Sequence, residues 1–539
     1  MRSDIVARVE YFSTLLCRFR RWLQTQPAGL AASLFAIAAW CMAANYSVLQ
    51  DIIYYDGAHL LDAFLHGEHI SLVPDGYYLF PRVFTGALLL FLSRLFGTAP
   101  LGYHAVGLML HMVNAGLFFF LAWRILGEPT PALLVALCFS GGPHTEVVGL
   151  IGAISELLVV GCCAGCLLAW FRFRDSGSAG SFLAVWMTAW SACFFRDTAV
   201  VLPGMLLLDY LLRPSRSRSF NRGALALLTL GWLPVVAALS NSFSRWLTAP
   251  PRSPTDQSLV QGIGTVFTIA DNAIIGFFHD ARPVLESLSG IPLFPLLCLL
   301  GVVILSLPPV QPRLRRLGLV MCTWCLIVNA PYAMLQFFSS NYSYPAGYGY
   351  AIIPFLWIFA FLVWSRFRSY VPRLVRLGAA CIVLWSAFSS TRAHRDRYRN
   401  ENAEMRVLKT ISLQLGNLGP VHQMVLLRDY SGALYGAPEV NTIIHFFTGI
   451  LLDTRIAYCA PDVLEHAVSC EDLRSAASEC EPENASSREW TLETLDDDTL
   501  LAGVIRKTVG TEGYSFTTRI CPVRVMTETG RTGTVGQAR

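Results

Sequence analysis

The chain has 539 residues, of which 54% are hydrophobic and 14% are charged, and its mean hydropathy is +0.48. Soluble proteins carry about 25% charged residues, so this composition excludes a string of soluble domains and predicts a polytopic membrane protein. The formal net charge of +4 is too small to indicate a nucleic-acid partner.

The N-terminal segment is rich in arginine and precedes an apolar run at residues 28–49. A helix needs roughly 20 apolar residues to cross a bilayer, and this run is long enough. A secretory signal has a shorter apolar core followed by a small-residue cleavage site. We therefore expect an uncleaved first helix, with residues 1–28 in the cytoplasm.

Further apolar segments follow along the chain, and basic clusters separate them. Because cytoplasmic segments carry an excess of arginine, the clusters at 172–174, 213–222, 313–316 and 365–376 are placed inside. The loop at 50–81 and the turns near 143–146, 194–199 and 339–347 then lie outside. The expected helices are 104–126, 131–143, 147–171, 181–195, 198–212, 223–241, 289–307, 316–336, 349–365 and 374–390.

One segment leaves the helix count open, and one outer loop contains a candidate polar residue. Residues 83–97 are long enough for a short span or for a helix lying in the interface, and the charge bias favours the interfacial helix. The outer loop 242–288 contains Asp271, which we expect on a solvated face at the membrane surface.

The fold class that follows is an all-α polytopic membrane protein with about eleven transmembrane helices, spanning residues 29–390. After residue 391 the composition turns polar, and MVLLRD, NTIIHFFTGILL and YSFTTRI indicate strands or short helices. Residues 391–539 are therefore expected to form a small extracytoplasmic α/β domain. Its four cysteines predict two disulfides of undecided connectivity, and hence an oxidising compartment: Cys459, Cys470, Cys480 and Cys521.

Polar residues that this topology brings to the outer face form one set of carboxylates, histidines and arginines. A carboxylate there can take a proton from an acceptor hydroxyl, and arginine can hold a phosphate leaving group. The set therefore suits transfer of a group from a phosphate-bearing lipid. Besides further Asp, Glu and His residues of the first loop, it includes Asp56, Arg82, His144, Glu146, Glu156, Arg196, Asp197, Asn341, Tyr342 and Tyr344.

Each of these residues also has a purely structural interpretation. An interfacial turn would use Asp56 before glycine, and His144 with Glu146 would cap a helix or form a buried ion pair. Glu156 needs a partner if it is buried, either Arg196 or His144, because an unpaired carboxylate there costs several kcal/mol.

Three further polar residues and one charged pair have structural interpretations of other kinds, namely helix–helix hydrogen bonds and an ion pair between neighbours in sequence. Helix–helix hydrogen bonds account for His104, His111 and Asn114 no less well than a functional role does. Arg196 and Asp197 would form an ion pair with each other.

The stretch FGTAPLGYHAVGLMLHMVNAGL (96–117), followed by PHTEVVGLIGAISELL (143–158), resembles a signature of the C-type (GT-C) membrane glycosyltransferases. It is nearest to the transmembrane and tetratricopeptide-repeat O-mannosyltransferases and their bacterial relatives. Matching positions are Gly102, Tyr103, His104, His111, Asn114, His144, Thr145, Glu146 and Glu156. More weakly, residues 195–198 and 341–345 resemble two later elements of the family.

Where the family carries arginines, this chain has Ile154 and Asn341, and Gly57 follows Asp56 in place of a second acidic residue. The tetratricopeptide repeats are absent. Arg82 or Arg196 would then have to take over the binding of phosphate.

The resemblance implies a GT-C-like fold, a polyprenyl-phosphate-linked sugar donor, and a glycan, lipid or protein acceptor on the outer face of a bacterial inner membrane. Asp56 would be the general base, and His144 with Glu146 would orient the acceptor or the sugar. Arg196 and Arg82 would neutralise the departing phosphate, and the attack would invert the anomeric carbon. A divalent metal ion held by first-loop Asp and His residues is left open.

Two other classes of function remain open at this point. A transporter or flippase of lipid-linked sugars would also need charge within the membrane, although no internal repeat is visible. A non-catalytic membrane subunit derived from the family would account for the missing arginines.

Overall fold

The computed structural model describes most of the apolar segments and the ordered parts of the tail. The described ranges, with isolated positions between them, are residues 27–51, 83–142, 144–196, 202–211, 293–306, 315–324, 345–367, 371–401, 403–415, 423–428, 437–450, 452–460, 469–482, 499–509 and 513–522.

The chain divides into two compact units, which we describe separately. The membrane unit comprises Met1–Asp51 and Ile70–Asp396. The tail unit comprises Arg397–Arg539 together with Ile52–His69 from the first loop.

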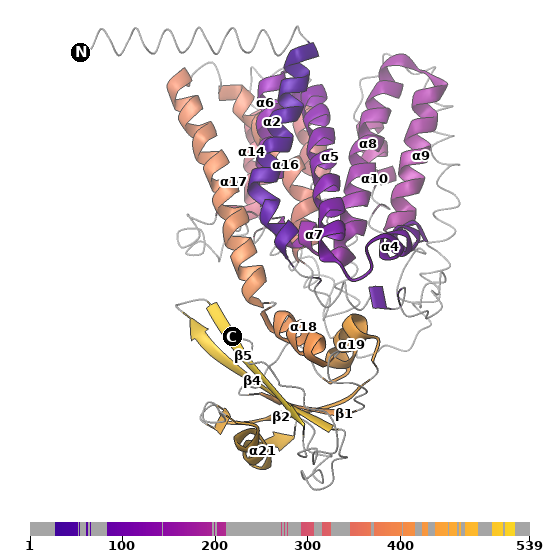
Figure 1. Cartoon of the computed structure of the whole chain (residues 1–539). Coiled ribbons are helices and arrows are strands. Elements are labelled where there is room, and N and C mark those ends of the chain that lie inside the picture. The colour runs from indigo at the N-terminus through magenta and orange to yellow at the C-terminus, as the bar shows by residue number, and fades with distance from the viewer. Residues whose placement is uncertain are drawn as a thin grey trace, which may run out of the picture. The chain divides into compact units, whose positions relative to one another are not determined.

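Helices make up the membrane unit and run side by side as a bundle (Figure 1). The N-terminal ones are α2 (Pro27–Asn45), η1 (Tyr46–Gln50), α4 (Val83–Phe96), α5 (Pro100–Leu126), α6 (Pro129–Ser140), α7 (Thr145–Gly149) and η2 (Ile151–Ala153). The later ones are α8 (Ile154–Ser176), α9 (Ala179–Phe195), α10 (Leu202–Leu211), α14 (Leu293–Ser306), α16 (Pro345–Phe367) and α17 (Arg373–Glu401).

Four helices of the described part are long and apolar enough to cross a membrane: Ala28–Leu49, Pro100–Leu126, Ile151–Ser176 and Leu374–Ala393. Shorter apolar helices accompany them. Large apolar side chains on these helices are exposed, for example Leu183 on α9 and Trp385 on α17. Exposed apolar faces of this kind suit contact with lipid, so the protein is an integral membrane protein. The predicted count of about eleven spans includes residues 223–241, which lie outside the described residues.

Glycine sets two of the long helix ends. Gly127 follows α5 with φ of +77°, and Gly177 follows α8 with φ of +64°. Both residues use the left-handed region, which is favourable for glycine and closes the last helical turn. Within the bundle, Gly161 of α8 faces Asn114 of α5, where any added Cβ would collide with the amide. Small residues at such a crossing let two membrane helices approach closely.

Helix α4 is only 14 residues long, which corresponds to about 21 Å against a hydrocarbon layer of about 30 Å. The Thr85 hydroxyl donates to the carbonyl of Phe195 at the end of α9, at 3.0 Å. Beyond its other end, the Gly97 carbonyl accepts from the hydroxyl of Tyr103 in α5, at 2.7 Å. In Figure 1, α4 lies across the ends of α8 and α9 instead of running alongside them. This placement supports the interfacial helix and not a full span.

The helix expected at 147–171 is broken, which changes the position of Glu156 within its helix. Helix α7 ends at Gly149, Leu150 is extended, and α8 starts only at Ile154. Glu156 therefore lies in the first turn of α8, not inside a continuous helix that begins at residue 147. Hydropathy could not show the break, because the residues across it are all apolar or small.

Asp271 also differs from expectation. Its carboxylate accepts a hydrogen bond from the backbone N–H of Phe294 at 2.5 Å, in the first turn of α14. Asp271 therefore caps a helix instead of lying on a solvated face.

The tail unit contains a five-stranded sheet of order β3-β2-β1-β4-β5. Its strands are β1 (Gln423–Arg428), β2 (Asp453–Tyr458), β3 (Glu481–Pro482), β4 (Thr499–Val509) and β5 (Gly513–Pro522). The central strand β1 is parallel to β2 and β4, and in register Leu426 pairs with Ile456 on one side and Ala502 on the other. The edge strands β3 and β5 are antiparallel.

Helices α18 (Ala403–Leu415), α19 (Ala437–Thr448) and α21 (Cys470–Ser478) complete the tail unit. Helix α19 forms the crossover between parallel strands β1 and β2, as parallel pairing requires. A capping box begins α21, in which the side chains of Ser469 and Asp472 each accept from the other residue's backbone N–H.

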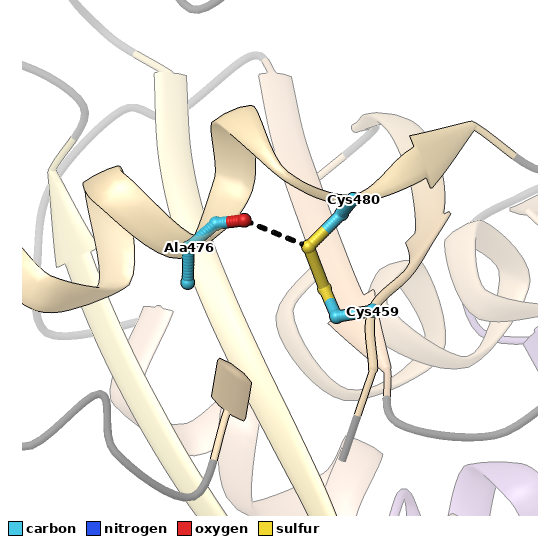
Figure 2. Close-up of a disulfide and its surroundings, with 3 residues drawn as sticks. All are labelled: Cys459, Ala476 and Cys480. Carbon is cyan, nitrogen blue, oxygen red and sulfur yellow. Dashed lines mark hydrogen bonds between the residues drawn. A yellow bond between two sulfur atoms is a disulfide. The ribbon is translucent and has the colours of Figure 1, made fainter. Parts of the chain in front are cut away.

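A disulfide joins Cys459, directly after β2, to Cys480, directly before β3 (Figure 2). The Cys480 sulfur also lies 2.9 Å from the carbonyl oxygen of Ala476. This is a close contact and not a hydrogen bond, because a disulfide sulfur carries no proton. Cys470 is disulfide-bonded as well. Cys521 belongs to β5 by its backbone, and its pairing stays a prediction.

Candidate functional site

The first candidate element is a buried ion pair between α8 and the end of α9. Arg196 caps α9 with an extended backbone, and its Nη2 lies 2.8 Å from Oε1 of Glu156. Its Nη1 donates to the hydroxyl of Ser155 at 3.1 Å. Glu156 is fully buried and Arg196 is 5% exposed. The buried carboxylate thus has the cation that its burial demands.

The second element is a charged cluster at the opposite end of α8. Asp209 of α10 accepts from Trp170 Nε1 at 3.0 Å and from Arg174 Nη1 at 3.3 Å. Arg316 Nη2 lies 3.9 Å from the same carboxylate, and Arg124 forms an ion pair with Asp175 at the ends of α5 and α8.

These two charged regions are separated along α8 by the stretch from Glu156 to Arg174. At 1.5 Å per residue this corresponds to about 27 Å, close to the thickness of the hydrocarbon layer. The described charges of this part of the bundle therefore gather at its two ends, one rich in arginine and one holding the Glu156–Arg196 pair.

The third element is the corner between α6 and α7, which leads into His144. The carbonyls at the end of a helix have no donor within the helix, and in an apolar bundle other groups must satisfy them. Side chains from three other helices do so here. Trp40 donates to Leu137 at 3.0 Å, Asn45 and His111 donate to Ser140 at 2.9 and 3.2 Å, and the single hydroxyl proton of Thr391 is shared among the carbonyls of Gly142 at 2.9 Å, Gly141 and Ala387 of its own helix.

His111 and Asn114 therefore have structural roles in the described bundle. Nδ1 of His111 accepts from the Tyr350 hydroxyl at 2.9 Å, which leaves Nε2–H to donate to Ser140. Asn114 donates to the same hydroxyl at 2.9 Å and to the carbonyl of Leu157 at 2.8 Å. These bonds join α5 to α16, α6 and α8. These bonds are of the kind that the helix–helix interpretation of the two motif residues predicts.

His144 is fully buried, and its ring packs among other rings. The ring centroids lie 4.9 Å from Tyr350, 5.0 Å from Phe139 and 5.6 Å from His111. The imidazole thus faces the interior of the bundle, where it fixes the corner that carries Glu146. Glu146 belongs to α7 by its backbone.

Several predicted site residues lie outside the described residues, and their roles stay predictions: Asp56, Arg82, Asp197, Asn341, Tyr342 and Tyr344. The motif residues Tyr103 and His104 are both buried in α5. Across the described ranges, no group of three or more His, Cys, Asp or Glu side chains is placed to hold a metal ion. The predicted divalent ion would depend on first-loop residues, so it stays open.

Sequence reasoning missed the side chains that hold the corner. Trp40, Asn45, Tyr350 and Thr391 are polar-tipped residues in apolar helices, and that is the signal that could have marked them. Nothing in their spacing shows that they meet at this corner, because they come from three helices, α2, α16 and α17.

No family model matches the chain. A stretch of 109 residues is 34% identical to Protein O-mannosyl-transferase Tmtc1 of Drosophila melanogaster. It covers 19% of this chain and 12% of that protein, so only about an eighth of the length of the relative is matched. The similarity confirms the predicted resemblance to the membrane O-mannosyltransferases.

Among solved structures, the crystal structure of ArnT from Cupriavidus metallidurans bound to undecaprenyl phosphate superposes with a TM-score of 0.48 and 12% sequence identity. The superposition covers 89% of this chain and 94% of that one. Likeness at this level carries no conclusion about activity.

Proposed function

We propose that this protein is a membrane glycosyltransferase that moves a sugar from a polyprenyl-phosphate-linked donor to an acceptor on the extracytoplasmic face. The observation that carries the proposal is the Glu156–Arg196 pair, buried at the end of the bundle opposite the arginine cluster. It is supported by the 34% identity over 109 residues to an O-mannosyltransferase.

Orientation follows from the two ends of α8. The basic segments 172–174, 213–222 and 313–316 adjoin, in sequence, the end that holds Arg174, Asp209 and Arg316. The positive-inside rule assigns that end to the cytoplasm, so the Glu156–Arg196 end faces out. The Cys459–Cys480 disulfide supports an oxidising, periplasm-like compartment for the tail unit.

In the proposed reaction, an acceptor hydroxyl attacks the anomeric carbon of the sugar while Asp56 takes the hydroxyl proton. The new bond joins the acceptor oxygen to the anomeric carbon, and the bond from that carbon to the phosphate oxygen breaks. The lipid phosphate leaves with both electrons of that bond. Attack from the opposite side inverts the anomeric centre.

Arg196 would neutralise the departing phosphate, helped by Arg82. A guanidinium already fixed by Glu156 and Ser155 needs little reorganisation when charge develops, which is the advantage of a preorganised site. Asp197, Asn341, Tyr342 and Tyr344 would line the substrate site, and Glu146 would orient the acceptor or the sugar. His144 would act indirectly, by packing at the corner between α6 and α7 and so helping to position Glu146.

The test is an assay of the purified protein in nanodiscs and in sealed proteoliposomes with radiolabelled polyprenyl-phosphate hexoses. Covalent transfer of label to an added glycan, lipid or peptide acceptor supports the proposal. Exchange of the donor between leaflets without transfer would instead identify a flippase. Neither activity, in protein that is monodisperse and folded, would favour a non-catalytic subunit.

A further inference from the structure

The first loop of the membrane unit is partly built into the tail unit. Residues Ile52–His69 belong to the same compact unit as Arg397–Arg539, although the loop precedes the tail by more than three hundred residues. Two of its apolar side chains, Ile53 and Leu61, are 1% and 0% exposed. Full burial of both shows that the loop is packed at these two positions.

One polar contact joins this loop to a helix of the tail. Nδ1 of His445 lies 2.9 Å from Oδ2 of Asp62, and both side chains are 14% exposed. Because both side chains are largely shielded from water, dissolved salt screens the electrostatic attraction between them less than it would on an open surface.

The helix that presents His445 is firmly anchored. His445 lies in the last turn of α19, where Ile444 and Phe446 on either side are buried. The Asn441 side chain of the same helix accepts from the backbone N–H of Thr454 in β2 at 3.1 Å. His445 is thus a fixed point of the tail, and Asp62 is the loop residue attached to it.

Asp56, the proposed general base, lies six residues before Asp62 and between the buried Ile53 and Leu61. An unattached loop would let this carboxylate sample many positions, and a misplacement of about 1 Å can lower a rate by about a hundredfold. A contact that fixes the loop six residues from the base in sequence is therefore expected to affect the rate of sugar transfer.

We propose that His445 is a positioning residue, which holds the first-loop segment carrying Asp56 through its hydrogen bond to Asp62. Residues 397–539 would then take part in the reaction without contributing a catalytic group. This inference rests on the proposed function for its effect on rate, whereas the attachment of the loop can be measured independently.

The first readout needs no activity. Amide hydrogen exchange of residues 52–69 is measured by mass spectrometry in the wild type, in Asp62→Asn, in His445→Ala and in the double variant. We expect faster exchange in both single variants and a less than additive increase in the double variant, because both single changes remove the same bond. His445→Asn should restore protection, since the Asn amide N–H lies near the position of Nδ1–H. Thr410→Ala, on α18, serves as the matched control, because its hydroxyl bonds only within its own helix.

The second readout is kinetic. His445→Ala is expected to lower kcat by about tenfold or more while leaving the KM for the donor unchanged, with His445→Asn close to wild type. Unchanged exchange of residues 52–69 in His445→Ala would overturn the attachment, and unchanged kcat in an active enzyme would overturn the positioning role. If the wild type transfers no sugar but the exchange pattern is as expected, the proposed function fails and the attachment stands.

Discussion

The guanidinium of Arg196, at the end of α9, lies 2.8 Å from the carboxylate of Glu156, in the first turn of α8, and both side chains are buried. Two helices that follow each other in sequence thus place their charged residues together at one end of the bundle. Removing one charge from such a pair leaves the other buried without compensation, and this is the costly change.

Arg196→Ala should lower the free energy of unfolding by about 3–5 kcal/mol, because Glu156 would keep a buried charge. Combining it with Glu156→Gln should recover much of that loss. Thermal unfolding in detergent measures both variants. Arg172→Ala, at an exposed arginine of α8, is the matched control and should change stability by no more than about 0.5 kcal/mol. Equal effects of Arg196→Ala and Arg172→Ala would contradict the burial of the pair.

The corner before His144 makes a separate prediction. Thr391→Val keeps the shape of the side chain but leaves the carbonyls of Gly141 and Gly142 without this donor, so the bundle should lose about 1–3 kcal/mol. Thr391→Ser should keep most of the stability. Thr323→Val is the control, since the exposed hydroxyl of Thr323 bonds to the carbonyl of Leu319 in its own helical turn. A melting temperature of Thr391→Val equal to that of the control variant would show that the hydrogen bonds to these carbonyls do not stabilise the bundle.

The apolar segments of the sequence were enough to predict α5, α9 and α14 to within a few residues at most ends. They failed at residues 147–153, where an apolar stretch hides the change from α7 to α8. Hydropathy records how apolar a segment is, and it does not record where the backbone turns within it.

For the candidate site, the sequence correctly raised the possibility that Glu156 would need Arg196, because a buried carboxylate requires a cation. It could not decide between Arg196 and His144, since that depends on how helices pack. It also left the role of His111 open. The structure assigns His111 to the Ser140 carbonyl and the Tyr350 hydroxyl, two partners far from it in sequence.

Asp271 predicts a pH dependence. Burial raises the pKa of this carboxyl above its usual value of 3.8, against the lowering effect of the N–H groups of Phe294 and Leu293 that bond to it. A raised native pKa stabilises the fold fully below pH 3.8, and the contribution is lost as pH rises through the native pKa. Asp271→Asn cannot ionise, so its stability relative to the wild type should increase from about pH 4 toward neutrality. A difference that stays constant over this range, in unfolding measured at several pH values, would rule out the raised pKa.

The tail disulfide predicts a local loss of stability on reduction. Cys459 and Cys480 close a loop with a sequence separation of 21, and a bond of this kind contributes about 3 kcal/mol. The double variant Cys459→Ala/Cys480→Ala should therefore lower the melting temperature of the tail unit. The measurement is the protease resistance of residues 397–539 as temperature rises. Cys381→Ala, at an exposed free cysteine of α17, is the control. Tail resistance that is unaffected by losing the bridge would contradict its structural role.

The central claim is that this chain transfers sugar with Asp56 as the general base. Its most direct test is the single-turnover rate of transfer from a polyprenyl-phosphate sugar by the purified wild type and by Asp56→Asn, in preparations with equal melting temperatures and equal donor binding. The account predicts a rate lower by about 10²–10⁴ in the variant, the contribution of a positioned base. Transfer at the wild-type rate by Asp56→Asn would contradict it.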